Sequence, residues 1–118
     1  MVNHADLSRQ LALALGYFPE SVCIDTDKQG KYEPVCRVYR ISYDMGPYWR
    51  WFDYRHSDIV LRLLDWLMRE HDGHCFPMNG RDGVFIRCIC GFAVPQVRVD
   101  ADTLEEAVAR ACIAVGVR

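Results

Sequence analysis

Hydrophobic positions recur with a helical period in three parts of the chain, which predicts three helices. The first helix is expected over residues 4–15, with Asn3 as its N-cap and Gly16 as its stop. The last helix is expected to start after Thr103, which stands in capping-box spacing with Glu106. Both helices therefore carry a start signal in the sequence, in addition to their apolar stripes.

The second helix is expected to open at Ser57 or Asp58 and to end at Asp72-Gly73. Its apolar positions form a broad face, which is typical of a helix that packs on a core. This face is expected to consist of Ile59, Val60, Leu63, Leu64, Leu67 and Met68. We therefore expect this helix to anchor the core, with Leu64 among its buried side chains.

Alternating and β-branched positions predict strands between these helices. Residues 35–43 alternate, residues 44–47 carry a turn signal, and residues 48–55 form a run rich in aromatic side chains. The pattern indicates a hairpin. A short apolar segment at residues 22–24 precedes it, and residues 25–31 have the composition of an exposed, mobile loop.

A second hairpin is expected after the second helix. Residues 74–78 and 84–90 read as its strands, with residues 79–83 as a five-residue connection. A further strand is expected over residues 93–99, at a sheet edge or with a bulge, because Pro95 cannot donate a backbone hydrogen bond. The element order predicts an α+β fold, a mainly antiparallel sheet layered with three helices in the order α-β-β-α-β-β-α. No linker is evident, so residues 1–118 are expected to form a single α+β domain.

Composition and charge narrow the function classes. The chain has 118 residues and a formal net charge of −2, which gives phosphate backbones no overall attraction. No segment has the length of a membrane span and no signal peptide is evident, so we expect no membrane partner, a cytoplasmic location and reduced cysteines. These cysteines are Cys23, Cys36, Cys75, Cys88, Cys90 and Cys112.

Two groups of residues suggest chemistry, and each has a structural alternative. Cys88 and Cys90, with His71, His74 and Cys75, could surround a zinc ion, but their spacing fits the turn pairs of structural zinc sites poorly. Cys75 beside His74 is the candidate nucleophile and base, but adjacent residues in a strand point to opposite faces. We therefore expect no metal, no cofactor and no catalytic residue. Phosphate-binding, serine-elbow, kinase and zincin motifs are also absent from the sequence.

The aromatic run is the most distinctive segment. In a strand, Tyr48, Arg50, Phe52 and Tyr54 would share one side, and Trp49, Trp51 and Asp53 the other. Trp, Tyr and Arg are enriched at binding hot spots. The expected partner-binding residues are Tyr48, Trp49, Arg50, Trp51, Tyr54 and Arg55. Core tryptophans beside edge arginines remain the structural alternative.

Arginines occur on or beside several of the expected strands. They are Arg37, Arg40, Arg50, Arg55, Arg87 and Arg98. A solvated sheet face explains them, and a concave arginine-aromatic surface for a phosphate-bearing ligand or an acidic partner is the alternative.

Three segments carry a resemblance to a known family. The tryptophan-containing strand at residues 49–53, the helix at residues 57–67 and the closing helix at residues 101–112 look like the phage ABA-sandwich domain family of small bacteriophage proteins. The resemblance covers roughly residues 5–117. It implies a phage or prophage source, while the function of most members is unassigned.

These observations together favour a non-enzymatic, phage-encoded protein that acts by binding, as an inhibitor of a host defence system in the manner of an anti-CRISPR protein. The expected partner is a host protein or protein complex in the host cytoplasm. A small-ligand binder that sequesters a nucleotide signal is the alternative, with tryptophan stacking on the base. A small metal- or cysteine-dependent enzyme is the third hypothesis, and the sequence leaves a homodimer open.

Overall fold

The computed structural model describes residues 2–26, 29–42, 46–91 and 96–116. Their contacts group into two units, one that ends at Asp53 and one that begins at Tyr54. Each unit contains its own antiparallel sheet of three strands and at least one helix packed against that sheet. The expectation of a single domain stays a prediction, and the two units are described in turn.

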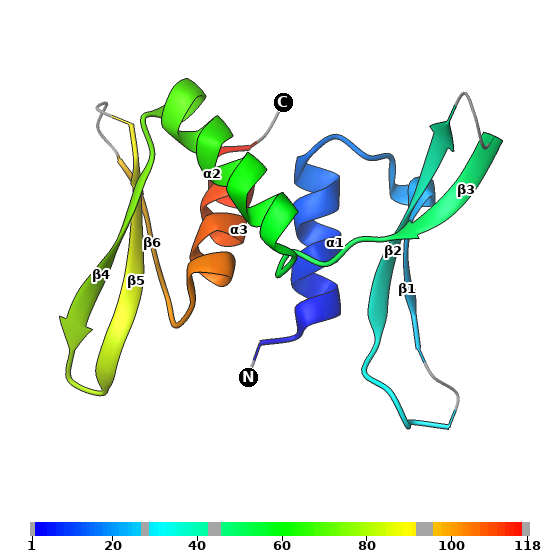
Figure 1. Ribbon diagram of the computed structural model, residues 1–118, viewed down its shortest axis with the longest axis horizontal. Helices are drawn as coiled ribbons and strands as arrows, with labels where there is room; N and C mark the ends of the chain where they lie inside the picture. Colours follow the sequence, from blue (N-terminus) through cyan, green and yellow to red (C-terminus); the bar gives the residue numbers. More distant parts are fainter. Residues whose placement is uncertain (1, 27–28, 43–45, 92–95, 117–118) are drawn as a thin grey trace. The chain divides into compact units, whose positions relative to one another are not determined.

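The first unit begins with helix α1 (His4–Ala14), followed by a short 3-10 turn (Pro19–Ser21). Its sheet consists of β1 (Val22–Asp25), β2 (Val35–Ser42) and β3 (Gly46–Trp51), with β2 in the middle (Figure 1). The antiparallel pairing expected between the strands of the first hairpin is confirmed for β2 and β3. Residues 44 and 45 of the expected turn lie outside the described residues, and Gly46 and Pro47 belong to β3. The short apolar segment before β2 adds a strand that the expected element order did not include.

The boundaries of α1 follow from its end residues. The Asn3 side chain accepts a hydrogen bond of 3.0 Å from the Asp6 backbone N–H, as an N-cap does. Gly16 has a φ of 100°, a left-handed conformation that costs glycine little and other residues much. The cap and the stop predicted for this helix are both confirmed.

One face of this sheet packs on α1 and the other is left open. Pairing places Val22 beside Val38, and Ile24 beside Cys36, so these side chains share a face. Val22, Cys36 and Val38 are buried, as are Leu7 and Leu11 of α1, which contacts β1 and β2 (Figure 1). The core of the first unit therefore lies between this face and the helix.

The second unit contains α2 (Ser57–His71), then β4 (His74–Gly80), β5 (Gly83–Cys90) and β6 (Val97–Ala101), then α3 (Leu104–Val115). Strand β5 lies in the middle of the sheet, α3 packs on that sheet, and α2 packs on α3 (Figure 1). Edge strand β4 contains a proline, Pro77, which pairs with Ile86 of β5. Residues 93–95 of the expected last strand, with Pro95 and the edge or bulge expected there, lie outside the described residues.

The apolar face of α2 is narrower than the sequence predicts. Val60, Leu63 and Leu67 are buried, whereas Leu64 is half-buried and Met68 is 52% exposed. The helix ends as expected at Asp72, which has a left-handed φ of 48°. Leu67, which was expected on this face, has no exposed surface, whereas the expectation that Leu64 is buried was wrong because Leu64 lies at the margin of the face.

The second hairpin is tighter than expected. Gly80 pairs with Gly83, so the connection is the two residues Arg81 and Asp82 and not residues 79–83. The five-residue connection was wrong because pairing continues through polar and glycine positions whose composition is typical of loops. This register places Cys75 directly opposite Cys88.

The end signals of α3 are confirmed. The Thr103 side chain accepts a hydrogen bond from the Glu106 backbone N–H, and Gly116 has a left-handed φ of 67°. The chain is an α+β protein, as predicted, in the order α-β-β-β-α-β-β-β-α. Among the described residues, no helix has the length and hydropathy needed to cross a membrane.

Candidate functional site

The aromatic run does not form a strand over its whole length. Strand β3 ends at Trp51, and the Phe52 backbone N–H then donates a 2.9 Å hydrogen bond to the Cys36 carbonyl. Phe52 and Tyr54, expected on an alternating strand face, are buried beyond the end of the strand. The reason is local: the chain leaves the sheet here to begin α2, so the alternation stops.

The two tryptophans of this run lie on the sheet face opposite α1. Pairing sets Trp49 beside Tyr39, and Trp51 beside Arg37, so all four side chains share that face. Trp49 is 45% exposed and Trp51 64% exposed. We call this surface the open face, and it consists of Cys23, Asp25, Val35, Arg37, Tyr39, Trp49 and Trp51.

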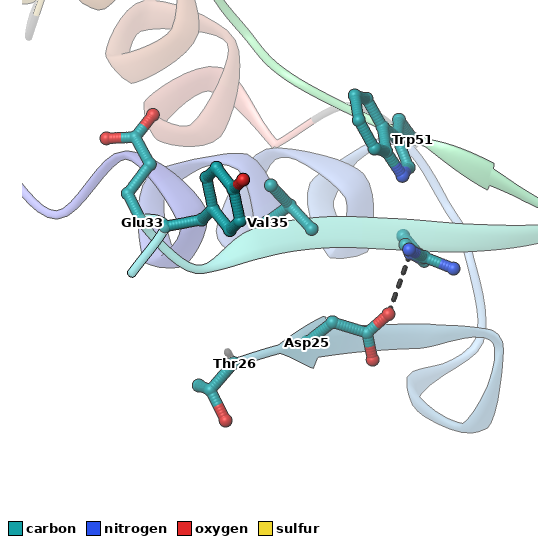
Figure 2. Close-up of a pocket in the computed structure, with 7 residues that line it drawn as sticks. Asp25, Thr26, Glu33, Val35 and Trp51 are labelled. Carbon is teal, nitrogen blue, oxygen red and sulfur yellow. Dashed lines mark ion pairs between the residues drawn. The ribbon is translucent and has the colours of Figure 1, made fainter. Parts of the chain in front are cut away.

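A pocket of about 670 Å³ lies at one end of the open face, where β1 ends and β2 begins (Figure 2). All of its lining residues belong to the first unit: Asp25, Thr26, Tyr32, Glu33, Val35, Arg37 and Trp51. Its volume is within the range of about 300–1,000 Å³ that is usual for ligand sites in proteins. The pocket thus combines two aromatic rings with carboxylates and a guanidinium.

An ion pair spans the pocket from β1 to β2. Arg37 Nε lies 2.7 Å from Asp25 Oδ2, and both side chains are partly exposed (Figure 2). Asp25 pairs with Val35 in the sheet, so the arginine reaches it diagonally from two residues further along β2. The positive charge of Arg37 is therefore already matched by a carboxylate of the same sheet.

The other sequence-predicted site residues are dispersed. Tyr48 and Arg50 pair with Arg40 and Val38, which places them on the sheet face opposite the tryptophans. Tyr54 is buried and Arg55 exposed, and both follow the end of the strand in the second unit. The structure thus brings Trp49 and Trp51 onto one sheet face with Tyr48 and Arg50 on the opposite face, whereas Tyr54 and Arg55 belong to the second unit. Whether these residues bind a partner stays a prediction.

Two arginines of the second sheet, Arg87 and Arg98, form ion pairs with the same carboxylate, that of Asp100. Arg87 Nε lies 2.8 Å from Asp100 Oδ1, and Arg98 lies 3.3 Å from Asp100 Oδ2. The hydrogen bond from Arg87, then that from Arg98, lowers the pKa of the Asp100 carboxyl. This arrangement agrees with the solvated-face alternative for these two arginines.

The cysteine chemistry differs from the expectation of six reduced thiols. Cys75 and Cys88 form a disulfide across β4 and β5, and four cysteines are free. That expectation was wrong for this pair, because a two-residue connection brings the two side chains face to face. A bonded Cys75 has no thiolate to offer as nucleophile. Across the described residues, no group of three or more His, Cys, Asp or Glu side chains could hold a metal ion.

The free thiols are poorly suited to nucleophilic chemistry. Burial raises the pKa of Cys36 to about 11 and that of Cys112 to about 12. Burial also raises the pKa of Cys90, and burial together with the Asp25 charge raises that of Cys23. Because the thiolate is the reactive form, these environments favour packing over reactivity.

Sequence reasoning missed four pocket residues. Asp25 and Thr26 were assigned to the expected loop over residues 25–31, but Asp25 belongs to β1 and pairs with Val35. Tyr32 and Glu33 lie beyond that stretch, in a segment without a strand pattern. A tyrosine that is 70% exposed leaves no periodic signal, because periodicity reports only the buried side of an element.

No protein-family model, curated protein or solved structure matches this chain.

Proposed function

We propose that the protein acts by binding a partner protein through the open face of the β1–β2–β3 sheet. The observation that supports this proposal is the exposure of Tyr39, Trp49 and Trp51 on one sheet face, opposite the face that packs on α1. Large aromatic side chains bury much area at little entropic cost when a partner covers them. Arg37 and Asp25 add polar groups next to these rings.

A protein partner fits this surface better than a nucleic acid does. The chain has a net charge of −2, and the arginine of the open face is paired with a carboxylate. A protein surface that binds nucleic acid needs cationic side chains that can replace the counterions of the phosphates. Aromatic rings with a balanced set of charges instead resemble the composition of protein interfaces.

The resemblance to the phage family implies a phage source and no particular activity. For a phage-encoded protein, we propose that the partner is a component of a host defence system and that binding inhibits it. This part of the proposal rests on the resemblance, and the binding surface rests on the open face. The two parts are tested by different experiments.

Affinity capture with matched variants tests the binding surface. Wild-type protein, the double variant Trp49→Ala/Trp51→Ala and the control Phe18→Ala are each used as bait in a bacterial lysate. Phe18 is the matched control because it is an aromatic side chain 69% exposed in the same unit but outside the sheet. The captured protein is identified by mass spectrometry, purified and titrated against each variant.

We expect the double variant to bind at least about tenfold more weakly than wild type, since interface aromatic residues contribute about 1–3 kcal/mol each. The Phe18→Ala control is expected to bind like wild type. Equal binding by all three proteins would refute the assignment of the open face. The defence hypothesis is tested separately, by the survival of a phage that carries each variant in a host with and without its defence systems.

A further inference from the structure

The pocket at the end of the open face is lined by both aromatic and charged side chains. Trp51 and Tyr32 present exposed rings, and two carboxylates, Asp25 and Glu33, accompany a single guanidinium in the lining. In Figure 2, Trp51 lies on one side of the pocket and Asp25 and Thr26 on the other, with Val35 between them. Among the described lining residues, two carboxylates and one guanidinium are charged, and the Lys31 ammonium lies beside them over the Tyr32 ring.

The aromatic rings of the pocket also favour a cation, because of the charge distribution of the rings themselves. The face of an indole or phenol ring is the negative part of its quadrupole, and it attracts ammonium or guanidinium groups. The chain shows this at one of the two rings: the Lys31 ammonium lies over Tyr32, 5.9 Å from the ring centroid. The indole of Trp51, the more favourable ring type, is 64% exposed.

An anionic group would meet a less suitable site. The Arg37 guanidinium, which belongs to the described part of the lining, lies 2.7 Å from Asp25 Oδ2, so a phosphate would have to compete with that carboxylate for Arg37. A phosphate would also approach the Glu33 carboxylate. These charges disfavour the nucleotide that the sequence offered as an alternative ligand.

We propose that this pocket receives an arginine side chain of the partner protein, whose guanidinium stacks on Trp51 and faces the carboxylates. The inference rests on the proposed function, because it names the group of the partner that the open face recognises. Arginine suits the site because its planar group stacks on aromatic rings and also forks onto carboxylate oxygens. A pocket of about 670 Å³ has room for the side chain and its flanking backbone.

The test uses N-acetyl-L-argininamide as the probe and N-acetyl-L-citrullinamide as its matched control. Citrulline has nearly the same shape as arginine and no charge, so the comparison isolates the cation. Binding to the full chain is followed by the NMR signal of the Trp51 indole N–H, and guanosine monophosphate is titrated in parallel. We expect saturable binding of argininamide with a Kd on the order of millimolar, and binding of citrullinamide at least about tenfold weaker.

Substitutions of lining residues test whether the probe binds in the pocket. Glu33→Gln removes one negative charge without changing shape, and we expect it to weaken argininamide binding several-fold. Trp51→Leu is expected to weaken it further. Glu20→Gln is the matched control, because Glu20 is an exposed glutamate of the same unit outside the pocket lining. Once the partner is identified, saturating argininamide is expected to compete with the partner for the wild-type protein.

The outcomes separate this inference from the proposed function. Equal binding of citrullinamide, preferential binding of guanosine monophosphate, no binding of argininamide, or argininamide binding without competition would each overturn the arginine assignment. In all of these cases the proposed function survives if the Trp49→Ala/Trp51→Ala variant still loses the partner. If that variant keeps the partner, the proposed function fails, whatever the probe does.

Discussion

Tyr39 and Trp49 meet edge to face across β2 and β3, with ring centroids 5.3 Å apart and ring planes at 61°. The two residues are direct cross-strand partners, so the contact links the two strands at the centre of the open face. Each side chain keeps more than a third of its surface exposed. This aromatic pair therefore stabilises the sheet and also presents area to a partner.

A double-mutant cycle is expected to reveal the energy of this pair. Tyr39→Ala and Trp49→Ala should show a coupling of about 0.5–1.5 kcal/mol in the free energy of unfolding, as aromatic pairs do. Urea denaturation of the two single variants and the double variant measures it. Phe18→Ala combined with Trp49→Ala is the control, and its effects should add. A coupling of zero for Tyr39 and Trp49 would show that the contact contributes nothing to stability.

Leu67→Ala is expected to destabilise the protein by about 2–5 kcal/mol, because a fully buried leucine leaves a cavity when it is truncated. Leu61→Ala on the same helix should change stability by less than about 0.5 kcal/mol, since Leu61 is 64% exposed. Chemical denaturation of both variants gives the comparison. Similar losses for the two would mean that the solvent-facing side of α2 has been assigned incorrectly.

Thiol counting is expected to give four reactive cysteines in the denatured, unreduced chain and six after reduction. Reduction should lower the free energy of unfolding by about 2–4 kcal/mol, because the bond between Cys75 and Cys88 limits the conformations of the unfolded chain. The variant Cys75→Ala/Cys88→Ala should be insensitive to reductant. Six thiols without reduction would restore the expectation drawn from the sequence.

Stability is expected to decrease at alkaline pH because of two buried thiols. Their folded pKa values of about 11 for Cys36 and about 12 for Cys112 lie above the ordinary value of 9.0. Well below pH 9.0 both thiols are protonated in both states, and their contribution to stability is constant. As the pH rises from 9.0 towards these folded values, the unfolded chain ionises first, so the free energy of unfolding falls.

Urea midpoints measured across this pH range test the effect. The variant Cys36→Ala/Cys112→Ala supplies the control, because it keeps every other titrating group. Its stability should decrease less steeply with pH than that of wild type. Parallel curves for the two proteins would exclude these thiols as the source of the decrease.

Local signals in the sequence predicted the helices well and the strand register poorly. Asn3 and Thr103 act through hydrogen bonds to residues three positions away, so their roles can be recognised in the sequence. The ion pair of Arg37 with Asp25 depends on how β1 pairs with β2. The sequence of the segment that connects these two strands has no periodic pattern that predicts this pairing. Local propensity does not determine that pairing.

The disulfide between Cys75 and Cys88 could have been predicted from the spacing of the two cysteines about the turn. Cys75 and Cys88 are equidistant from the turn at Arg81-Asp82, so a hairpin with a two-residue connection sets them opposite each other. The five-residue connection would not have required that pairing. For the open face, the alternation of Trp49 with Arg50 was sufficient to place both tryptophans on one side, but not to show which side α1 covers.

Pro77 has a consequence for self-association. It lies in β4, an edge strand that pairs with β5 alone within the described sheet. An exposed strand edge is a template for amyloid-like growth, because its backbone donors and acceptors can recruit the same strand of another molecule. Proline has no N–H to contribute, and it is tolerated in a sheet where that missing donor would face outwards. Pro77 thus interrupts the row of donors on the outer side of β4 near its middle, which makes this edge a poorer template for the addition of another strand.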